Sequence, residues 1–206
     1  MNFEAIKTAL TDRPLSMVDG RRPCAVLVPL VRQNGQLCLL FEVRSTLLDM
    51  QPGEVCYPGG SMEIGETAVE CALRETQEEL GLDPAEIEVL GALDYVIHLS
   101  GFPVYPILAR LPDDWEQKIR LNKVEVEDIF TIPLSYLRYN PPEKARVERT
   151  FHSLDDLPEV ERALIEEYPR RDLLPMLFWR YNGQLLWGMT ARVTEWLLRW
   201  LKEQEQ

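Results

Sequence analysis

Residues 60–82 read Gly-Ser-Met-Glu-Ile-Gly-Glu-Thr-Ala-Val-Glu-Cys-Ala-Leu-Arg-Glu-Thr-Gln-Glu-Glu-Leu-Gly-Leu. Within this stretch, Thr67 and Glu70 have the spacing of a capping box, in which each side chain accepts a hydrogen bond from the other residue's backbone N–H. Gly81 follows at the position where helices commonly end in the left-handed conformation. The pattern therefore predicts a helix from Thr67 to Leu80.

The predicted helix has an apolar face and an acidic face. A turn of about 100° per residue places one stripe on the apolar face: Val69, Ala72, Leu73, Thr76 and Leu80. Glu75, Glu78 and Glu79 share the other side, an arrangement that is also common on a solvated helix surface. The glycine turn at 57–61 and the nearby Glu66 favour a different interpretation, a site of hard oxygen ligands for Mg²⁺ or Mn²⁺.

Composition indicates one globular domain over residues 1–206. The chain has 46% apolar and 27% charged residues, which excludes disorder of the whole chain. Its 22 basic and 34 acidic residues leave a net charge of −12, which argues against nucleic acid as a partner. A chain this acidic can bind a diphosphate if divalent cations lie between the two anions.

Targeting signals and membrane spans are not expected. The longest stretch without charge, residues 95–109, is interrupted by two prolines and is too short to cross a bilayer. Residues 1–14 contain four charged side chains and no apolar core, so they fit no secretory signal. The four cysteines form no Cys-x-x-Cys pair, and we interpret them as buried thiols. A cytoplasmic location is therefore expected.

The remaining segments predict an α+β fold, in which strands dominate the middle of the chain. Asn34-Gly35 and Asn182-Gly183 indicate two hairpins. Strands are expected at 24–31, 36–44, 87–98, 104–111, 128–132, 145–152, 174–181 and 184–187. Helices are expected at about 3–12 and 190–203, with a short helical turn at 133–137.

The quoted stretch also resembles a known family. Gly60, Glu66, Arg74-Glu75, Glu78-Glu79 and Gly81-Leu82 have the identities and spacing of the complete signature of the Nudix hydrolases. Thr76 stands where the family usually has an aliphatic residue. The resemblance implies an α/β/α sandwich around a mixed, curved β-sheet. It also implies hydrolysis of a nucleoside diphosphate linked to another group, with Mg²⁺ or Mn²⁺ required.

Roles for individual residues follow from the same resemblance. Glu75 and Glu79 would be the main metal ligands, Glu78 a further ligand with a catalytic role, and Glu66 a weaker contributor. Arg74 would orient a glutamate rather than contact the substrate. Gly59 and Gly60 would shape the substrate-binding loop ahead of the helix.

Family members also use a carboxylate far downstream, as a metal ligand or as the base that activates water. Glu125 fits its usual placement best, and Glu127 and Asp128 are rivals. A solvated acidic turn is the alternative interpretation of this segment.

Upstream residues resemble the coenzyme A diphosphatase subfamily. Arg44-Ser45, Gly53 and residues 57–60 have the spacing of its second motif, although Asp49 replaces an arginine and Tyr57 replaces a phenylalanine. Coenzyme A or a derivative would then be cleaved to 4′-phosphopantetheine and 3′,5′-ADP. Arg44 would contact a phosphate or form a salt bridge at the strand end, and Ser45 would be structural.

Three other functions remain open from the sequence. Asp49 favours a diphosphatase for ADP-ribose or another nucleoside diphosphate derivative. A non-catalytic nucleotide-binding domain would be expected to lack some signature carboxylates, and none is lost here. Trp196 and Trp200 lie one helical turn apart near the C-terminus, which suits intramolecular packing, a protein-interaction surface or a homodimer interface.

Overall fold

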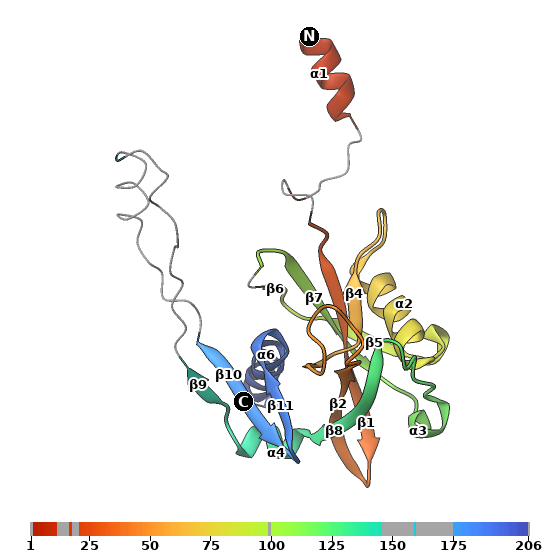
Figure 1. Ribbon diagram of the computed structural model, residues 1–206, viewed down its shortest axis with the longest axis vertical. Coiled ribbons are helices and arrows are strands. Elements are labelled where there is room, and N and C mark those ends of the chain that lie inside the picture. Colours follow the sequence, from red (N-terminus) through yellow and green to blue (C-terminus); the bar gives the residue numbers. More distant parts are fainter. Residues whose placement is uncertain are drawn as a thin grey trace. The chain divides into compact units, whose positions relative to one another are not determined.

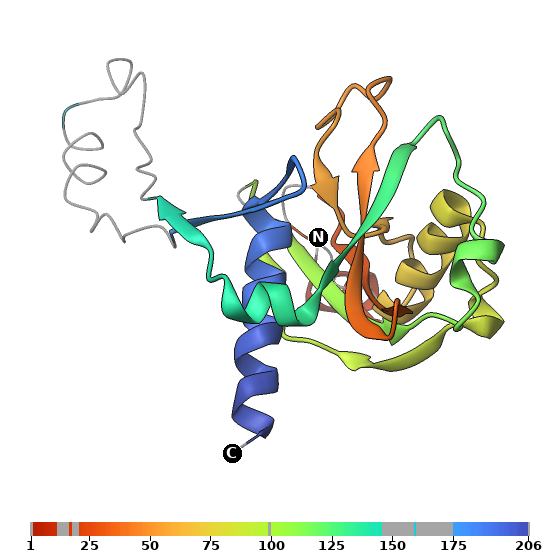
Figure 2. The ribbon, with the colours of Figure 1, turned by 90° about the horizontal axis from the view of Figure 1, so that it is seen from below.

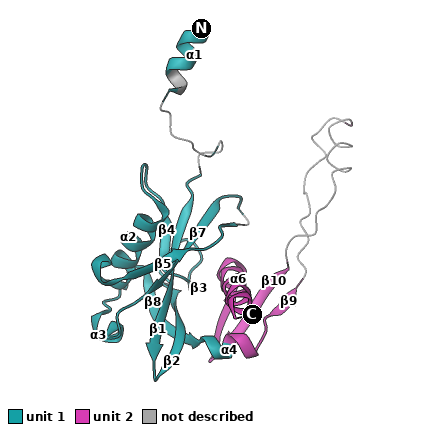
Figure 3. Cartoon of the chain, turned by 180° about the vertical axis from the view of Figure 1, so that it is seen from behind, with its two compact units in different colours: residues 1–136 teal, residues 137–206 magenta. Residues whose placement is uncertain are grey.

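The computed structural model of this chain describes residues 2–11, 17, 21–98, 100–145, 159 and 175–205 (Figure 1). Two compact units are present, residues 1–136 and residues 137–206 (Figure 3). The expectation of one domain over residues 1–206 therefore stays a prediction.

A long hairpin forms the centre of unit 1. Strands β1 (Cys24–Gln33) and β2 (Gln36–Arg44) pair antiparallel with Gln33 opposite Gln36. The two turn residues, Asn34 and Gly35, have φ values of 49° and 76°. A two-residue hairpin turn of this kind needs positive φ at both positions, which asparagine and glycine tolerate best. The first predicted hairpin is confirmed.

The sheet of unit 1 has eight strands and is mixed. Its main order is β3-β2-β1-β7-β5, with β4 on β1, β6 on β7 and β8 on β2. Strands β1 and β7 run parallel, and the other pairs are antiparallel. The remaining bounds are Val55–Cys56 (β3), Gly59–Ser61 (β4), Glu88–Ala92 (β5), Val96–Ile97 (β6), Pro103–Arg110 (β7) and Val126–Pro133 (β8). These strands confirm an α+β fold with a mixed sheet.

Strand β4 differs from the plain turn expected at residues 57–61. Gly59 and Gly60 pair antiparallel with Val26 and Ala25 of β1. A Cβ added at Gly59 would lie 2.3 Å from the Ala25 carbonyl oxygen, at a φ of 152° that favours glycine. Glycine therefore allows the segment to approach β1 closely enough to join the sheet.

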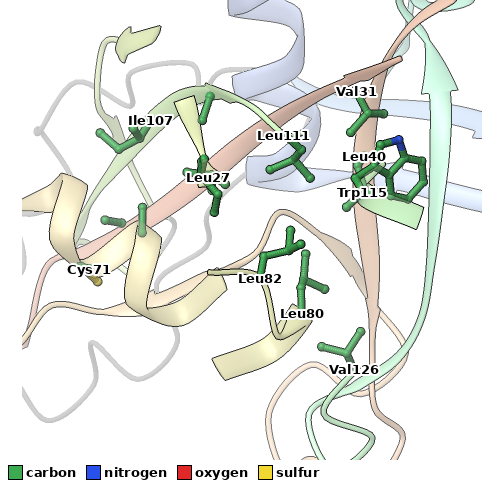
Figure 4. Packing of buried hydrophobic residues seen from close by; sticks show 14 of the residues in the cluster. Leu27, Val31, Leu40, Cys71, Leu80, Leu82, Ile107, Leu111, Trp115 and Val126 are labelled. Atoms are coloured by element: carbon green, nitrogen blue, oxygen red, sulfur yellow. The ribbon is translucent and has the colours of Figure 1, made fainter. Parts of the chain in front are cut away.

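Helix α2 (Ala68–Leu80) covers one face of this sheet and contacts β1, β4 and β7 (Figure 2). The hydrophobic core lies between helix and strands (Figure 4). It includes Leu27, Leu40, Leu80, Ile107 and Val126. Thr76 is buried as expected and donates its hydroxyl to the Ala72 carbonyl at 2.7 Å. Its hydroxyl is thereby satisfied within the helix.

Two short elements of unit 1 had no counterpart in the sequence prediction. They are the 3-10 helix η1 (Pro84–Glu86) and helix α3 (Trp115–Lys118). The leading helix α1 (Phe3–Leu10) confirms the expected one, and Asn2 caps it. Asp83 and Pro84 begin η1 in the way that a capping aspartate and an N-terminal proline begin longer helices.

Unit 2 contains a three-stranded antiparallel sheet, β11-β10-β9, and a long helix. The strands are β9 (Glu143–Ala145), β10 (Met176–Tyr181) and β11 (Gln184–Trp187), and helix α6 (Gly188–Gln204) contacts β10 and β11. Tyr181 lies opposite Gln184, which confirms the second hairpin. Helix α4 (Leu134–Tyr139) crosses the boundary between the units. The rest of the strand expected at 145–152 lies outside the described residues, as does Leu174.

Helix α6 confirms the C-terminal helix that the sequence predicts. Trp196 and Trp200 stack on each other with ring centroids 6.4 Å apart. Arg138 and Glu205 form an ion pair within unit 2. Among the described residues, no helix is both long and apolar enough to cross a membrane.

Candidate active site

Helix α2 is fixed at both ends, and its C-terminal end holds a second segment of the site. The Thr67 hydroxyl accepts from the Glu70 backbone N–H at 3.2 Å, and the Glu70 carboxylate accepts from the Thr67 backbone N–H at 2.8 Å. At the other end, the Asn122 N–H donates to the Glu79 carbonyl at 2.9 Å. The segment that leads to Glu125 is thereby attached to the last turn of α2.

Glu79 lies at the buried centre of the site. Its residue is only 3% exposed, and its Oε2 accepts a 2.9 Å hydrogen bond from the Gly59 backbone N–H. Burial, together with the negative charges of Glu42 and Glu75, raises the pKa of Glu79. The alternative interpretation, a solvated face shared by all three glutamates, is thus wrong for Glu79, because the Gly59 N–H contacts its carboxylate and the residue is buried.

Glu75 lies directly over the glycine loop. A Cβ added at Gly60 would fall 2.5 Å from its carboxylate, so a larger residue there would displace the Glu75 side chain from this position. The same carboxylate accepts from the Arg74 guanidinium at 2.8 Å. Burial raises the pKa of Glu75, because its effect is larger than the opposing effect of the Arg74 hydrogen bond and charge. Gly59 and Gly60 thus each contact one of the two glutamates expected to be the main metal ligands.

Arg74 joins the outer glutamates. Its Nε lies 2.9 Å from Glu66 Oε1 and its second terminal nitrogen 3.1 Å from Glu66 Oε2, which makes a bidentate pair. The hydrogen bonds from Arg74 lower the pKa of Glu66 to about 2. Glu78 is more distant, with 3.4 Å to Arg74 and a half-exposed side chain. Arg74 therefore contacts three glutamates of the quoted stretch.

Among the three downstream carboxylates, Glu125 is the one that approaches α2. It is half-buried, whereas Glu127 and Asp128 are exposed. Its negative charge raises the pKa of both Glu75 and Glu79. Its backbone carbonyl accepts from the Ser45 N–H at 2.8 Å, and its own N–H donates to Asn122. Glu125 is therefore held between the end of β2 and the end of α2.

Arg44 and Ser45 end strand β2 beside this segment. The Arg44 guanidinium donates two 3.4 Å hydrogen bonds to the Met50 carbonyl, across the loop that contains Asp49. The Ser45 side chain is buried and accepts from the Leu47 N–H at 3.2 Å, which fits the structural role expected for it. Arg44 thus points toward the loop and is half-buried.

Glu42 is a residue of this region that the sequence analysis missed. It is 1% exposed, on β2, opposite Cys56 of β3. The Cys56 thiol donates to Glu42 Oε1 at 3.1 Å, and burial together with Glu125 and Glu75 outweighs Arg44 and raises the pKa of Glu42. A glutamate inside the otherwise apolar run 37–43 was the signal that could have revealed it.

The carboxylates fit a hard divalent cation by their chemistry, because all the donors are oxygens and two of them are buried. Among the residues that the structure describes, no three His, Cys, Asp or Glu side chains are gathered closely enough to hold a metal ion. Arg74 holds Glu66 and Glu75 through ion pairs, while the Gly59 N–H holds Glu79. The site therefore suits a divalent cation by the oxygen chemistry and the negative charge of its side chains.

Comparisons with known proteins agree on one family. The NUDIX domain model matches residues 21–174. Nudix hydrolase 3 of Caenorhabditis elegans is 32% identical over 193 residues, which cover 92% of this chain and 78% of that protein. Peroxisomal coenzyme A diphosphatase NUDT7 of Mus musculus is 40% identical over 115 residues, which cover 54% of this chain and 47% of that protein.

The chain also has partial similarity to solved structures. The NUDIX domain of Shewanella oneidensis NrtR, in complex with ADP ribose, is 18% identical. The match covers 81% of this chain and 99% of that one, with a TM-score of 0.47. The family assignment rests on the domain model, which spans most of the chain, and on the nematode relative. This chain belongs to the Nudix hydrolase family.

Proposed function

We propose that this chain hydrolyses the diphosphate of coenzyme A or its derivatives, with Mg²⁺ or Mn²⁺, to 4′-phosphopantetheine and 3′,5′-ADP. The observation that carries the reaction is the set of α2 glutamates packed on the Gly59-Gly60 loop. The substrate is supported by the 40% identity to a relative named as a coenzyme A diphosphatase. Family members in general use divalent metal ions.

Glu75 and Glu79 would hold the cation as main ligands, with Glu78 as a further ligand and Glu66 as a weaker one. When bound, such a cation lowers the pKa of its water and offsets negative charge on the phosphates. The chain's own residues arrange this chemistry. The Gly59 N–H orients Glu79, and Arg74 orients Glu66 and Glu75. These contacts leave Arg74 as a positioning residue.

Glu125 is the base that we propose for the attacking water. Its carboxylate would accept the proton from water as the oxygen attacks phosphorus. The half-buried position of Glu125 beside α2 supports this choice, and the exposure of Glu127 and Asp128 argues against them. The Glu78 side chain is half-exposed, so it would be able to move and act as the further metal ligand when substrate binds.

Arg44 and the two glycines would receive the substrate. Gly59 and Gly60 present backbone without side chains, which allows phosphate oxygens to approach closely. Arg44 lies at the end of β2, where a guanidinium can bind a phosphate. The adjoining loop exposes Leu47 and Met50, whose side chains offer apolar surface to the pantetheine arm. This pairing of cation and apolar surface suits coenzyme A.

A diphosphatase for ADP-ribose or another nucleoside diphosphate derivative is the second candidate. Asp49 favours it, because an exposed carboxylate in this loop repels a ligand with several phosphates. ADP-ribose has no 3′-phosphate and carries less negative charge than coenzyme A. The loop at 45–53 is therefore the region that separates the two substrates.

A third possibility is a domain that binds nucleotides or proteins without catalysis. The presence of all signature glutamates argues against loss of catalysis. The stacked Trp196 and Trp200 would serve as a homodimer surface, since Trp200 is 39% exposed.

We also propose a cytoplasmic location, because all four cysteines are free, as in reducing compartments.

A substrate panel tests this function. The chain is incubated with coenzyme A, an acyl derivative, ADP-ribose and other nucleoside diphosphate derivatives, with Mg²⁺, with Mn²⁺ and with EDTA. Release of 3′,5′-ADP from coenzyme A, abolished by EDTA, is the expected result. Turnover of ADP-ribose without turnover of coenzyme A would reject the substrate and keep the reaction. Turnover of neither, by a folded chain that binds substrate, would favour the non-catalytic alternative.

A further inference from the structure

Glu42 is the buried group that the proposed reaction leaves unused. Strand alternation places its side chain on the same face of β2 as Cys38 and Leu40, which belong to the core beneath α2. Both neighbours are buried side chains of the hydrophobic core. A carboxylate at the end of such a row is costly to bury unless a partner stabilises its charge.

One carboxylate oxygen of Glu42 lacks any such partner. Oε1 accepts from the Cys56 thiol at 3.1 Å, a weak and uncharged donor. Among the described residues, Oε2 is the buried side-chain oxygen or nitrogen without a hydrogen bond. A buried acceptor without a donor costs about 1–3 kcal/mol, more for a charged group, so this oxygen requires an explanation, and a bound cation supplies one.

The chain connects the residue opposite Glu42 to the candidate metal ligands. Cys56, opposite Glu42 in the sheet, is three residues before Gly59, whose N–H holds the Glu79 carboxylate. The negative charges of Glu75 and Glu125 also act on Glu42 from α2 and from the segment before β8. Glu42 therefore lies close enough to Glu75, Glu79 and Glu125 for their negative charges to act on one another.

We propose that Glu42 Oε2 is an additional protein ligand of the divalent cation, supplied from β2. This inference rests on the proposed metal site and adds a residue outside the signature stretch. A cation would give the unpartnered oxygen a charged partner and would offset the repulsion among the carboxylates of Glu42, Glu75 and Glu79. The Cys56 thiol would then act as a positioning group that leaves Oε2 free.

Direct titration of Mn²⁺ tests this ligand without measuring turnover. Binding is followed by calorimetry and by loss of the free Mn²⁺ signal in electron paramagnetic resonance, for wild type, Glu42→Gln, Glu79→Gln and Glu88→Gln. Glu88 is an exposed glutamate of β5 and serves as the matched control. We expect Glu42→Gln to weaken Mn²⁺ binding by about tenfold or more, as losing a metal contact does.

The outcomes separate this inference from the metal site itself. Unchanged binding by Glu42→Gln, with weakened binding by Glu79→Gln, would overturn the role of Glu42 and keep the site. Absence of Mn²⁺ binding by wild type would reject the metal site as a whole. If Glu42→Gln fails to fold, a wild-type crystal soaked in Mn²⁺ decides the matter, since the ion either includes Glu42 Oε2 among its ligands or does not.

Discussion

The outer and inner glutamates of the site differ in how their negative charges are stabilised. On the outer side, Arg74 neutralises Glu66 through a bidentate pair and also contacts Glu75 and Glu78. On the inner side, Glu79 and Glu42 are almost fully buried, and their contacts are the Gly59 N–H and the Cys56 thiol, which carry no charge.

The difference appears in the protonation equilibria. The guanidinium lowers the pKa of Glu66 to about 2, whereas burial raises the pKa of Glu79 and of Glu42. The protein therefore supplies its own cation to the outer glutamates and leaves the inner ones in need of a proton or a metal ion. A divalent cation would be stabilised most on the inner side, so the inner glutamates should dominate catalysis.

Removal of an inner carboxylate should have the largest effect. We expect Glu79→Gln to lower kcat by about 10³-fold or more, equivalent to roughly 4 kcal/mol, because it deletes a proposed metal ligand. Steady-state kinetics with saturating Mg²⁺ measure this loss. The thermal midpoint in EDTA should be unchanged or higher, because the variant no longer buries a carboxylate.

Glu88→Gln is the control for this experiment, since Glu88 is exposed and far along the chain on β5. Its kcat should equal that of wild type. A Glu79→Gln variant that keeps more than a tenth of wild-type activity would contradict the dominance of the inner side.

Replacing the Arg74 guanidinium should lower kcat less than removing Glu79 does. Arg74→Lys keeps the positive charge but cannot form the forked contact with Glu66 while also reaching Glu75. We expect kcat to fall by about 10- to 100-fold, the range seen when a group that orients a metal ligand is lost. The thermal midpoint should fall by a few degrees, and calorimetry measures it.

Arg110→Lys is the matched control, because Arg110 forms exposed ion pairs with Glu88 and Asp113. Exposed pairs contribute little, so neither activity nor thermal midpoint should move measurably. Equal effects of the two lysine substitutions would mean that Arg74 is only a surface ion-pair partner.

The smallest effect is a pH dependence that differs between the two sides. Burial makes the native pKa of Glu79 higher than its value in the unfolded chain, so the native state binds the proton more tightly. Stability is then lost as pH rises from about 4.3 toward the raised native pKa. In EDTA, the thermal midpoint of Glu79→Gln minus that of wild type should therefore increase by a few degrees between about pH 6 and pH 8.5.

Glu66 should behave in the opposite way. Its native pKa is depressed, so its contribution is complete above the unfolded value of about 4.3 and is lost only as pH falls toward about 2. The thermal midpoint difference between Glu66→Gln and wild type should stay constant over the same range. Parallel pH curves for the two variants would contradict the contrast between the inner and outer glutamates.

Local sequence patterns determined much of the fold. The capping pair Thr67 and Glu70, the stop at Gly81 and the Asn-Gly turns all encode local backbone geometry, and the structure has each of them. The short strands β3 and β4 were not predicted, because β3 has only two residues and the glycines of β4 carry no strand preference of their own. Strand β3 pairs with β2, and β4 forms because glycine lets it approach β1 closely, so both pairings are tertiary properties.

The site also has features set by local sequence and features set by tertiary structure. The spacing of the α2 glutamates and their likeness to the Nudix signature are properties of the linear sequence. The burial of Glu79 results from the loop that packs over it, and the advantage of Glu125 over its rivals results from the hydrogen bonds that attach residues 122–125 to α2 and β2. No spacing rule relates those segments.

By itself, the sequence determined which side chains carry the negative charge and on which helix most of them stand, because periodicity and capping act over a few residues. Tertiary structure decided how the buried charges of Glu79 and Glu42 are compensated. Arg74 stabilises its neighbours because it is close to them in the helix and the preceding turn. Glu42 becomes part of the same cluster because strand pairing brings β2 beside β3, and the cost of burying a charge depends on everything packed around it.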